Sequence, residues 1–152
     1  MSQDQPIEEE IKEEAQKAVD PRHLERMSLL QALFIDEFPG QSWESLELKF
    51  DQAALTEIRN NKTIYDQEIS QVAQERPLHD LARIDLAILR LILHESKTKA
   101  TPVKVLIDEG VELAKDFGGE HSYAFINAVL EKLLLKKLAA AKDENSTSTT
   151  TT

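Results

Sequence analysis

Three consecutive residues in the second half of the sequence carry the side chains of a catalytic relay. Glu120, His121 and Ser122 supply a carboxylate, an imidazole and a hydroxyl, the groups with which many hydrolases activate a nucleophile. Neighbouring residues on a helix or turn point in different directions, so adjacency does not bring these groups together. Gly118 and Gly119 precede them, and a serine or carboxylate at a helix start caps amide groups. We therefore interpret the segment as a corner between two helices.

The remaining residues form no other pattern that is typical of an enzyme or a metal site. The chain has no cysteine, which excludes disulfides and thiolate ligands. His94 is followed by Glu95, but the second histidine of a zinc-binding helix is absent. Glycine-rich phosphate loops and calcium-binding loops are absent as well. We predict that the protein is not an enzyme and has no cofactor, no metal and no small-molecule substrate.

Apolar residues recur at intervals of three and four through most of the chain, and this spacing predicts an all-α protein. A first helix is expected over residues 22–38, because its apolar residues share one face and a Pro-Gly pair follows at 39–40. A short helix is expected near residues 43–48. Further helices follow, joined or kinked at the asparagine pair 60–61.

The segment 81–93 is the most apolar part of the sequence. Its apolar residues cover more than half of a helix circumference, so this helix should lie at the centre of a bundle. Arg83, Arg90 and His94 share the narrow face that remains. Asp85 projects from the apolar surface, so it needs a position near the helix end, a partner, or a binding surface beside it.

The two ends of the chain differ in composition from the part between them. Residues 1–20 contain seven acids and two lysines and contribute half of the net charge of −10. We expect an acidic N-terminal arm over 1–20 that is frayed or disordered, a folded domain over 21–141, and a disordered Ser/Thr-rich tail over 142–152. The last helix should fade near residue 140. Within the arm, a thin apolar stripe of helical spacing consists of Ile7, Ile11, Ala15 and Ala18.

The charge distribution limits the possible partners. The central part is mildly acidic, which argues against broad, non-specific binding to nucleic acids. Arg22, His23 and Arg26 nevertheless cluster at the start of the first helix, and lysines gather between 97 and 104. Each cluster is either a solvated surface or a set of phosphate contacts. No apolar run has membrane-spanning length and no secretory leader is visible, so we expect a cytoplasmic protein that does not bind membranes.

Two segments carry a specific order of motifs, RIDLAILRLILHE (83–95) and TPVKVLIDEGVELAKDFGGEHSYAFINAVLEK (101–132). An acid precedes Ala-Ile-Leu-Arg, a proline opens the next helix, and a glycine corner leads into Phe-Ile-Asn-Ala-Val-Leu. In order, spacing and length these segments resemble the C-terminal signature of the NusB family of transcription antitermination factors. The Gln-Ala-Leu-Phe at 31–34 is similar to the Gln-Ala-Leu-Tyr of that family's first helix.

The resemblance implies a NusB-like all-α bundle of about six to seven helices in two small subdomains. It implies a transcription antitermination factor that binds boxA-like single-stranded RNA with a NusE-type ribosomal protein and acts on the RNA polymerase complex. By this resemblance, Arg22, His23 and Arg26 belong to the RNA surface, and Phe34 and Asp85 belong to the partner surface. The alternative for Phe34 is core packing, and for Asp85 a buried pairing with an arginine.

The sequence also departs from the family pattern. The family's arginine run is reduced to Arg22 and Arg26, and an acidic arm precedes them, which leads to the hypothesis that the arm competes with RNA for these arginines. His121 stands where an acid is frequent. Gly110 replaces a usual alanine inside a helix, at a cost of about 1 kcal/mol. These departures favour an alternative function, a NusB-fold protein-interaction module with weakened RNA binding.

Overall fold

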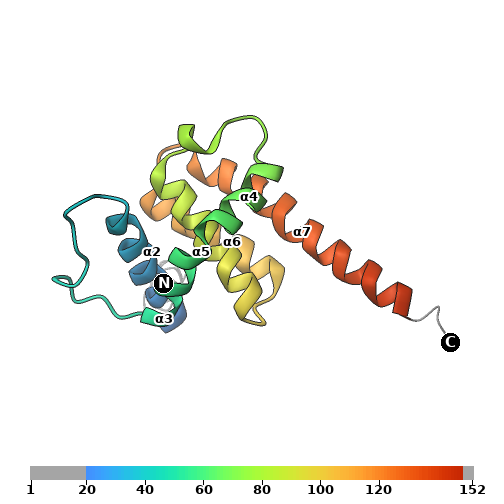
Figure 1. Cartoon of the computed structure of the whole chain (residues 1–152), viewed down its shortest axis with the longest axis horizontal. Coiled ribbons are helices and arrows are strands. Elements are labelled where there is room, and N and C mark those ends of the chain that lie inside the picture. The colour runs from blue at the N-terminus through green and yellow to red at the C-terminus, as the bar shows by residue number, and fades with distance from the viewer. Residues whose placement is uncertain (1–19, 149–152) are drawn as a thin grey trace, which may run out of the picture. The chain divides into compact units, whose positions relative to one another are not determined.

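Helices form all of the regular secondary structure in the described part of the chain, as the sequence predicts. The computed structural model describes residues 20–148, with side chains as far as residue 135. The chain divides into two compact units, residues 1–52 and residues 53–152, in agreement with the two expected subdomains. In chain order (Figure 1) the elements are α2 (Pro21–Asp36), α3 (Gln52–Asn60), α4 (Lys62–Val72), the 3₁₀ helix η1 (Leu78–Asp80), α5 (Arg83–Thr98), α6 (Val103–Phe117) and α7 (Ser122–Ser148).

The first unit contains α2 and the irregular segment that follows it. The carboxylate of Asp20 caps the helix by accepting a hydrogen bond from the backbone N–H of Arg22 at 3.0 Å. Pro21 fits the first turn, because the N–H that proline lacks has no helical partner there. After the helix ends, Gly40 adopts a left-handed conformation with φ of 79°, which glycine tolerates best.

The short helix predicted near residues 43–48 is wrong. The segment forms a turn in which the N–H of Leu46 donates to the carbonyl of Trp43 at 2.9 Å. The hydroxyl of Ser42 accepts from the N–H of Glu44 at 3.2 Å, a local bond that competes with helix formation. Six residues are also too few for an isolated helix. Instead, Trp43 packs edge-on against Phe50, with ring centroids 5.0 Å apart.

The second unit is built around α5, as its apolar sequence predicts. Helices α4, α6 and α7 all pack against it. Even Arg90 and His94, from the narrow polar face, are only 6% exposed. Helix α4 covers that face, because Arg90 donates two hydrogen bonds to the carboxylate of Asp66, at 2.7 and 2.8 Å. Apolar burial therefore places α5 at the centre, and a bidentate ion pair completes its remaining face.

A glycine allows three of these helices to approach one another closely. A Cβ atom added at Gly110 of α6 would lie 2.4 Å from Cδ1 of Leu130. It would also lie 3.4 Å from Cγ1 of Ile92 and 3.5 Å from Cγ2 of Ile126. Gly110 therefore lies where α5, α6 and α7 meet. Glycine lowers helix propensity at this position, as the sequence indicates, but its lack of a side chain permits the close packing.

Helix α7 continues to Ser148, beyond the fading expected near residue 140. Its C-terminal part extends away from the other helices of the second unit (Figure 1). The helical backbone over 142–148 differs from the disorder expected for the tail. Residues 1–19, which make up nearly all of the expected arm, and residues 149–152 lie outside the described residues. None of the described helices combines the length and the apolar composition that spanning a bilayer requires.

Because Gly110 is closely packed, the effect of a substitution there on stability should depend strongly on its neighbour Leu130. We expect Gly110→Ala to destabilise the protein by about 1–3 kcal/mol, because the new methyl group overpacks the junction. In a Leu130→Ala background the same change should stabilise the protein, since the methyl group then enters a cavity. Chemical denaturation of the double-mutant cycle measures both effects. Gly119→Ala is the control, because its Cβ would meet only the Ser122 Oγ, at 3.8 Å. Equal effects of Gly110→Ala on stability in both backgrounds would contradict the packing account.

The Arg90–Asp66 pair predicts a second effect on stability. The Arg90 side chain is 8% exposed, so Asp66→Ala leaves a buried guanidinium without its carboxylate. We expect a loss of about 3 kcal/mol in the free energy of unfolding. Glu112→Ala, which removes a 4.0 Å ion pair with the more exposed Lys115, should cost less than about 1 kcal/mol. A similar loss of unfolding free energy in both variants would show that the buried pair stabilises the protein no more than the exposed pair does.

Candidate functional site

The cationic residues at the start of α2 form the candidate RNA surface. Arg22 is exposed in the first turn, whereas His23 and Arg26 are half-buried. Arg22 and Arg26 are four residues apart, so they lie on one side of the helix. The helix N-terminus adds partial positive charge, which the carboxylate of Asp20 offsets in part. This small cationic edge can contact one or two phosphate groups.

Phe34, predicted to contact a protein partner or to pack in the core, lies near the end of the same helix. Its side chain is half-buried and is not part of the fully buried core. The Phe34 ring packs edge-on against Phe38, with centroids 5.1 Å apart and an interplanar angle of 72°. Phe38 is itself 37% exposed. The two rings form a partly exposed aromatic pair, a surface suited to protein contact.

Asp85 lies in the first turn of α5 and is only 8% exposed. Its Oδ1 atom has no hydrogen-bond partner among the described residues. Burial raises the pKa of the Asp85 carboxyl, and the Ser122 hydroxyl and the Arg76 guanidinium oppose that increase. Arg90, one of the two arginines on the same helix, pairs with Asp66 instead. Asp85 is therefore a buried carboxylate with incomplete polar compensation, which is costly for stability.

The corner between α6 and α7 contains Ser122, whose hydroxyl influences Asp85. Gly118 has φ of −86°, a value that any residue adopts, so the need for glycine here is spatial. A Cβ atom at Gly118 would lie 2.6 Å from the carbonyl oxygen of Ala114 and 2.6 Å from Cβ of Ser122. The Ser122 hydroxyl accepts a hydrogen bond from the N–H of Gly119 at 2.9 Å and so fixes the turn.

The Glu-His-Ser sequence at this corner does not form a relay. Ser122 is buried and bonded to the backbone, whereas Glu120 and His121 are exposed. A relay requires the three side chains to meet in space. Ser122 is the first residue of α7, so the interpretation of the segment as a helix corner is confirmed.

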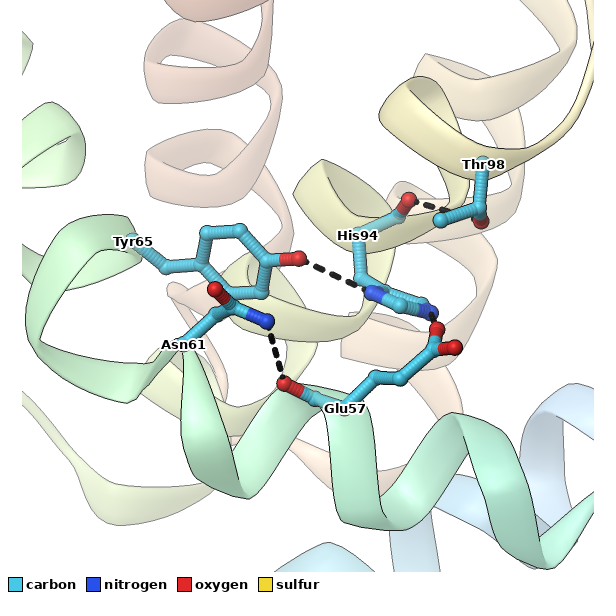
Figure 2. Close-up of polar contacts among 5 residues, drawn as sticks. All are labelled: Glu57, Asn61, Tyr65, His94 and Thr98. Carbon is cyan, nitrogen blue, oxygen red and sulfur yellow. Dashed lines mark hydrogen bonds and ion pairs between the residues drawn. The ribbon is translucent and has the colours of Figure 1, made fainter.

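A partly buried polar cluster in the second unit has no recognisable pattern in the sequence. Figure 2 shows His94 of α5 between Tyr65 of α4 and Glu57 of α3. The Tyr65 hydroxyl is 2.9 Å from His94 Nδ1, and His94 Nε2 is 3.3 Å from Glu57 Oε2. A carboxylate only accepts hydrogen bonds, so we assign the ring hydrogen to Nε2, and in the neutral ring Nδ1 then accepts from the Tyr65 hydroxyl. The Asn61 side chain donates to the Glu57 carbonyl at 2.8 Å, where α3 ends.

These contacts make the cluster a cross-link between helices. Burial raises the pKa of Tyr65, and the charges of Glu57 and Glu68 raise it further, so the hydroxyl remains a donor. Lys97 pairs with Glu68 and lies 5.1 Å from the centre of the Tyr65 ring. Because Tyr65 and His94 are 29 residues apart, only the tertiary structure reveals their contact.

Comparisons with known proteins agree on one family. The sequence model of the NusB family matches residues 24–135. The transcription antitermination protein NusB of Baumannia cicadellinicola subsp. Homalodisca coagulata is 35% identical over 127 residues, covering 75% of this chain and 91% of that protein. The protein of the same name from Herpetosiphon aurantiacus is 32% identical over 132 residues, covering 76% and 90%. The transcription antitermination protein NusB of Clostridium tetani is 40% identical over 91 residues, covering 59% of this chain and 60% of that protein.

The fold leads to the same family. The solved structure of T. maritima NusB superposes with a TM-score of 0.66 at 30% sequence identity, covering 75% of this chain and 90% of that chain. The residues matched by the family sequence model extend from Leu24 in α2 to Leu135 in α7, so they include helices of both units. Sequence and structure therefore give one answer: this chain belongs to the NusB family.

Proposed function

We propose that this chain is a transcription antitermination factor that supports ribosomal RNA transcription. In this role it binds boxA-like single-stranded RNA together with a NusE-type ribosomal protein, as part of an RNA polymerase complex. The observation that carries the proposal is the family match over residues 24–135, with relatives that are named transcription antitermination proteins. The protein acts by binding and performs no catalysis.

The RNA contact is assigned to the start of α2. Arg22 and Arg26 supply charge to the phosphates, and His23 between them supplies a ring that stacks on a base. The matched residues begin just after Arg22 and His23, where the acidic arm joins the helix. With so few phosphate contacts, the RNA affinity of this chain alone should be weak. A partner that also contacts the RNA compensates for this weak affinity, because it holds this chain near the RNA at a high effective concentration.

The partner contact is assigned to the Phe34–Phe38 pair and to Asp85. The aromatic pair offers exposed apolar area on the first unit. On the second unit, Asp85 Oδ1 is a buried acceptor without a hydrogen-bond partner among the described residues, so a partner group must enter the protein surface to reach it. A hydrogen bond from a basic or amide group of the partner would remove part of the cost of burying this carboxylate, which gives the partner a preference for the folded, ionised site.

The alternative function is a NusB-fold protein-interaction module that has lost most of its RNA affinity. The specific observation behind it is the charge distribution. Residues 1–20 carry a net charge of −5, from seven acids and two lysines, directly before Arg22 and Arg26. Since phosphate contacts provide most of the non-specific affinity for nucleic acid, a chain with this distribution can keep its protein partner and lose the RNA.

Measurements of RNA affinity across a salt series distinguish these functions. For boxA-like RNA with the NusE-type partner present, we expect Arg22→Ala/Arg26→Ala to weaken binding roughly tenfold or more. We also expect the slope of log K against log salt to become shallower by about 1.4, because about 0.7 is lost for each phosphate contact to a single strand. Fluorescence anisotropy with labelled RNA measures both quantities.

A control for the loss of two charges is Lys115→Ala/Lys132→Ala, which removes two exposed lysines from the second unit. This variant should retain the original slope. Partner binding without any RNA affinity, in the unaltered protein, would support the protein-interaction module instead.

Asp85 predicts a pH dependence of stability. The pKa of its carboxyl is raised in the folded state above the usual 3.8, which applies to the unfolded chain. At pH values between the unfolded-state and folded-state pKa, the folded protein therefore binds more protons than the unfolded chain. The ionised carboxylate therefore destabilises the fold at neutral pH, and this effect is lost as the pH falls toward 3.8. We expect Asp85→Asn to stabilise the protein by about 1 kcal/mol at pH 7, with the gain shrinking toward pH 4. Denaturation at a series of pH values measures the difference.

Asp108→Asn, an equivalent change at an exposed carboxylate on α6, controls for the loss of one negative charge. If Asp85 serves the partner, Asp85→Asn should also weaken partner binding although it stabilises the fold. A variant that is more stable and binds the partner normally would remove Asp85 from the interface.

A further inference from the structure

The first unit contains a groove that the proposed function does not use. It encloses about 690 Å³ between α2 and the segment around residues 47–50. The residues that line it include Pro21, Leu24, Met27 and Phe50, together with the charged residues Glu25, Glu47 and Lys49. Leu24 remains 45% exposed, so the groove offers apolar surface to a binding partner.

The groove does not coincide with the candidate RNA surface. Leu24 and Ser28, four residues apart on α2, both line it. Arg22 and Arg26 each lie two residues before these, which places them about 200° around the helix. RNA that contacts the two arginines therefore faces away from the groove, and the groove requires an occupant of a different kind.

We propose that the N-terminal arm of this chain, residues 1–19, docks in the groove through Ile7 and Ile11. The arm joins the described chain at Asp20, next to Pro21, which lines the groove. Eight residues separate Ile11 from Asp20. Fully extended, they span at most roughly 26 to 29 Å, and in helical form about 12 Å, so the isoleucines stay within reach of the groove.

The sequence of the arm complements the groove. Ile7 and Ile11 are four residues apart, so a helical arm presents both on one face, and Ala15 and Ala18 continue that face with small side chains. A stripe this thin cannot support an isolated helix, but docking on apolar surface would supply the missing stabilisation. The tether raises the effective concentration of the arm to roughly millimolar, so modest intrinsic affinity is sufficient.

This placement differs from competition between the arm and RNA for Arg22 and Arg26. An arm held by apolar contacts covers the groove and leaves the arginines to the RNA. It also tolerates salt, whereas an acidic segment held by ion pairs with Arg22 and Arg26 is released as salt screens the charges. The two arrangements can therefore be separated by ionic strength.

The single tryptophan provides a direct readout in the full-length chain. Trp43 contacts Phe50, and the Phe50 side chain lines the groove. We expect Ile7→Ser/Ile11→Ser to shift the emission of Trp43 to longer wavelength. Hydrogen exchange of amides in 24–31 and 47–50 should become about tenfold faster. Leu24→Ser, which alters the groove instead of the arm, should produce the same changes in emission and exchange.

Gln5→Ser/Gln16→Ser is the matched control, because these residues lie on the opposite side of a helical arm. It should leave emission and exchange unchanged. The measurements are made at about 0.05 M and about 0.5 M salt. Changes that appear at both salt concentrations support docking of the arm. No change in the isoleucine variant, a change confined to low salt, or a change that varies with protein concentration would overturn it, the last by identifying a second copy as the occupant.

Discussion

Burial of α5 is the constraint on which the second unit depends. A helix that is apolar around most of its circumference is stable only when other elements cover it, and α4, α6 and α7 do so. Two polar residues on its remaining face, Arg90 and His94, are then buried too. Asp66 satisfies the guanidinium of Arg90, and Tyr65 and Glu57 satisfy the ring of His94, so the cost of polar burial is offset by specific bonds.

Asp85 is the exception to this rule on the same helix. Its Oδ1 has no hydrogen-bond partner among the residues that the structure describes, and burial raises the pKa of its carboxyl, although a neutral residue of the same shape would fit at lower cost. Residues that lower stability in this way are typical of functional positions, where a binding partner supplies the missing interaction. The close packing at Gly118 and the hydrogen bond from the Gly119 N–H to the Ser122 hydroxyl fix the neighbouring turn.

The first unit is built differently: its described residues form one helix, α2, and an irregular segment. Its surfaces are distributed around α2: the arginines on one side, the groove on another, and the aromatic pair near the helix end. A single helix can separate these surfaces because residues two positions apart point in nearly opposite directions. The proposed RNA contact, partner contact and arm docking therefore each use a different part of the first unit.

The sequence by itself determined the helical class, the central position of α5, the corner at Gly118 and the family, because periodicity and short motifs are local properties. It failed at residues 43–48, where serine side-chain bonds and short length outweigh helical spacing. Only the tertiary structure decided the Arg90–Asp66 pair, the Tyr65–His94 contact and the packing role of Gly110. These contacts join residues distant in the chain, and their pairing follows from how the helices pack, which no local pattern encodes.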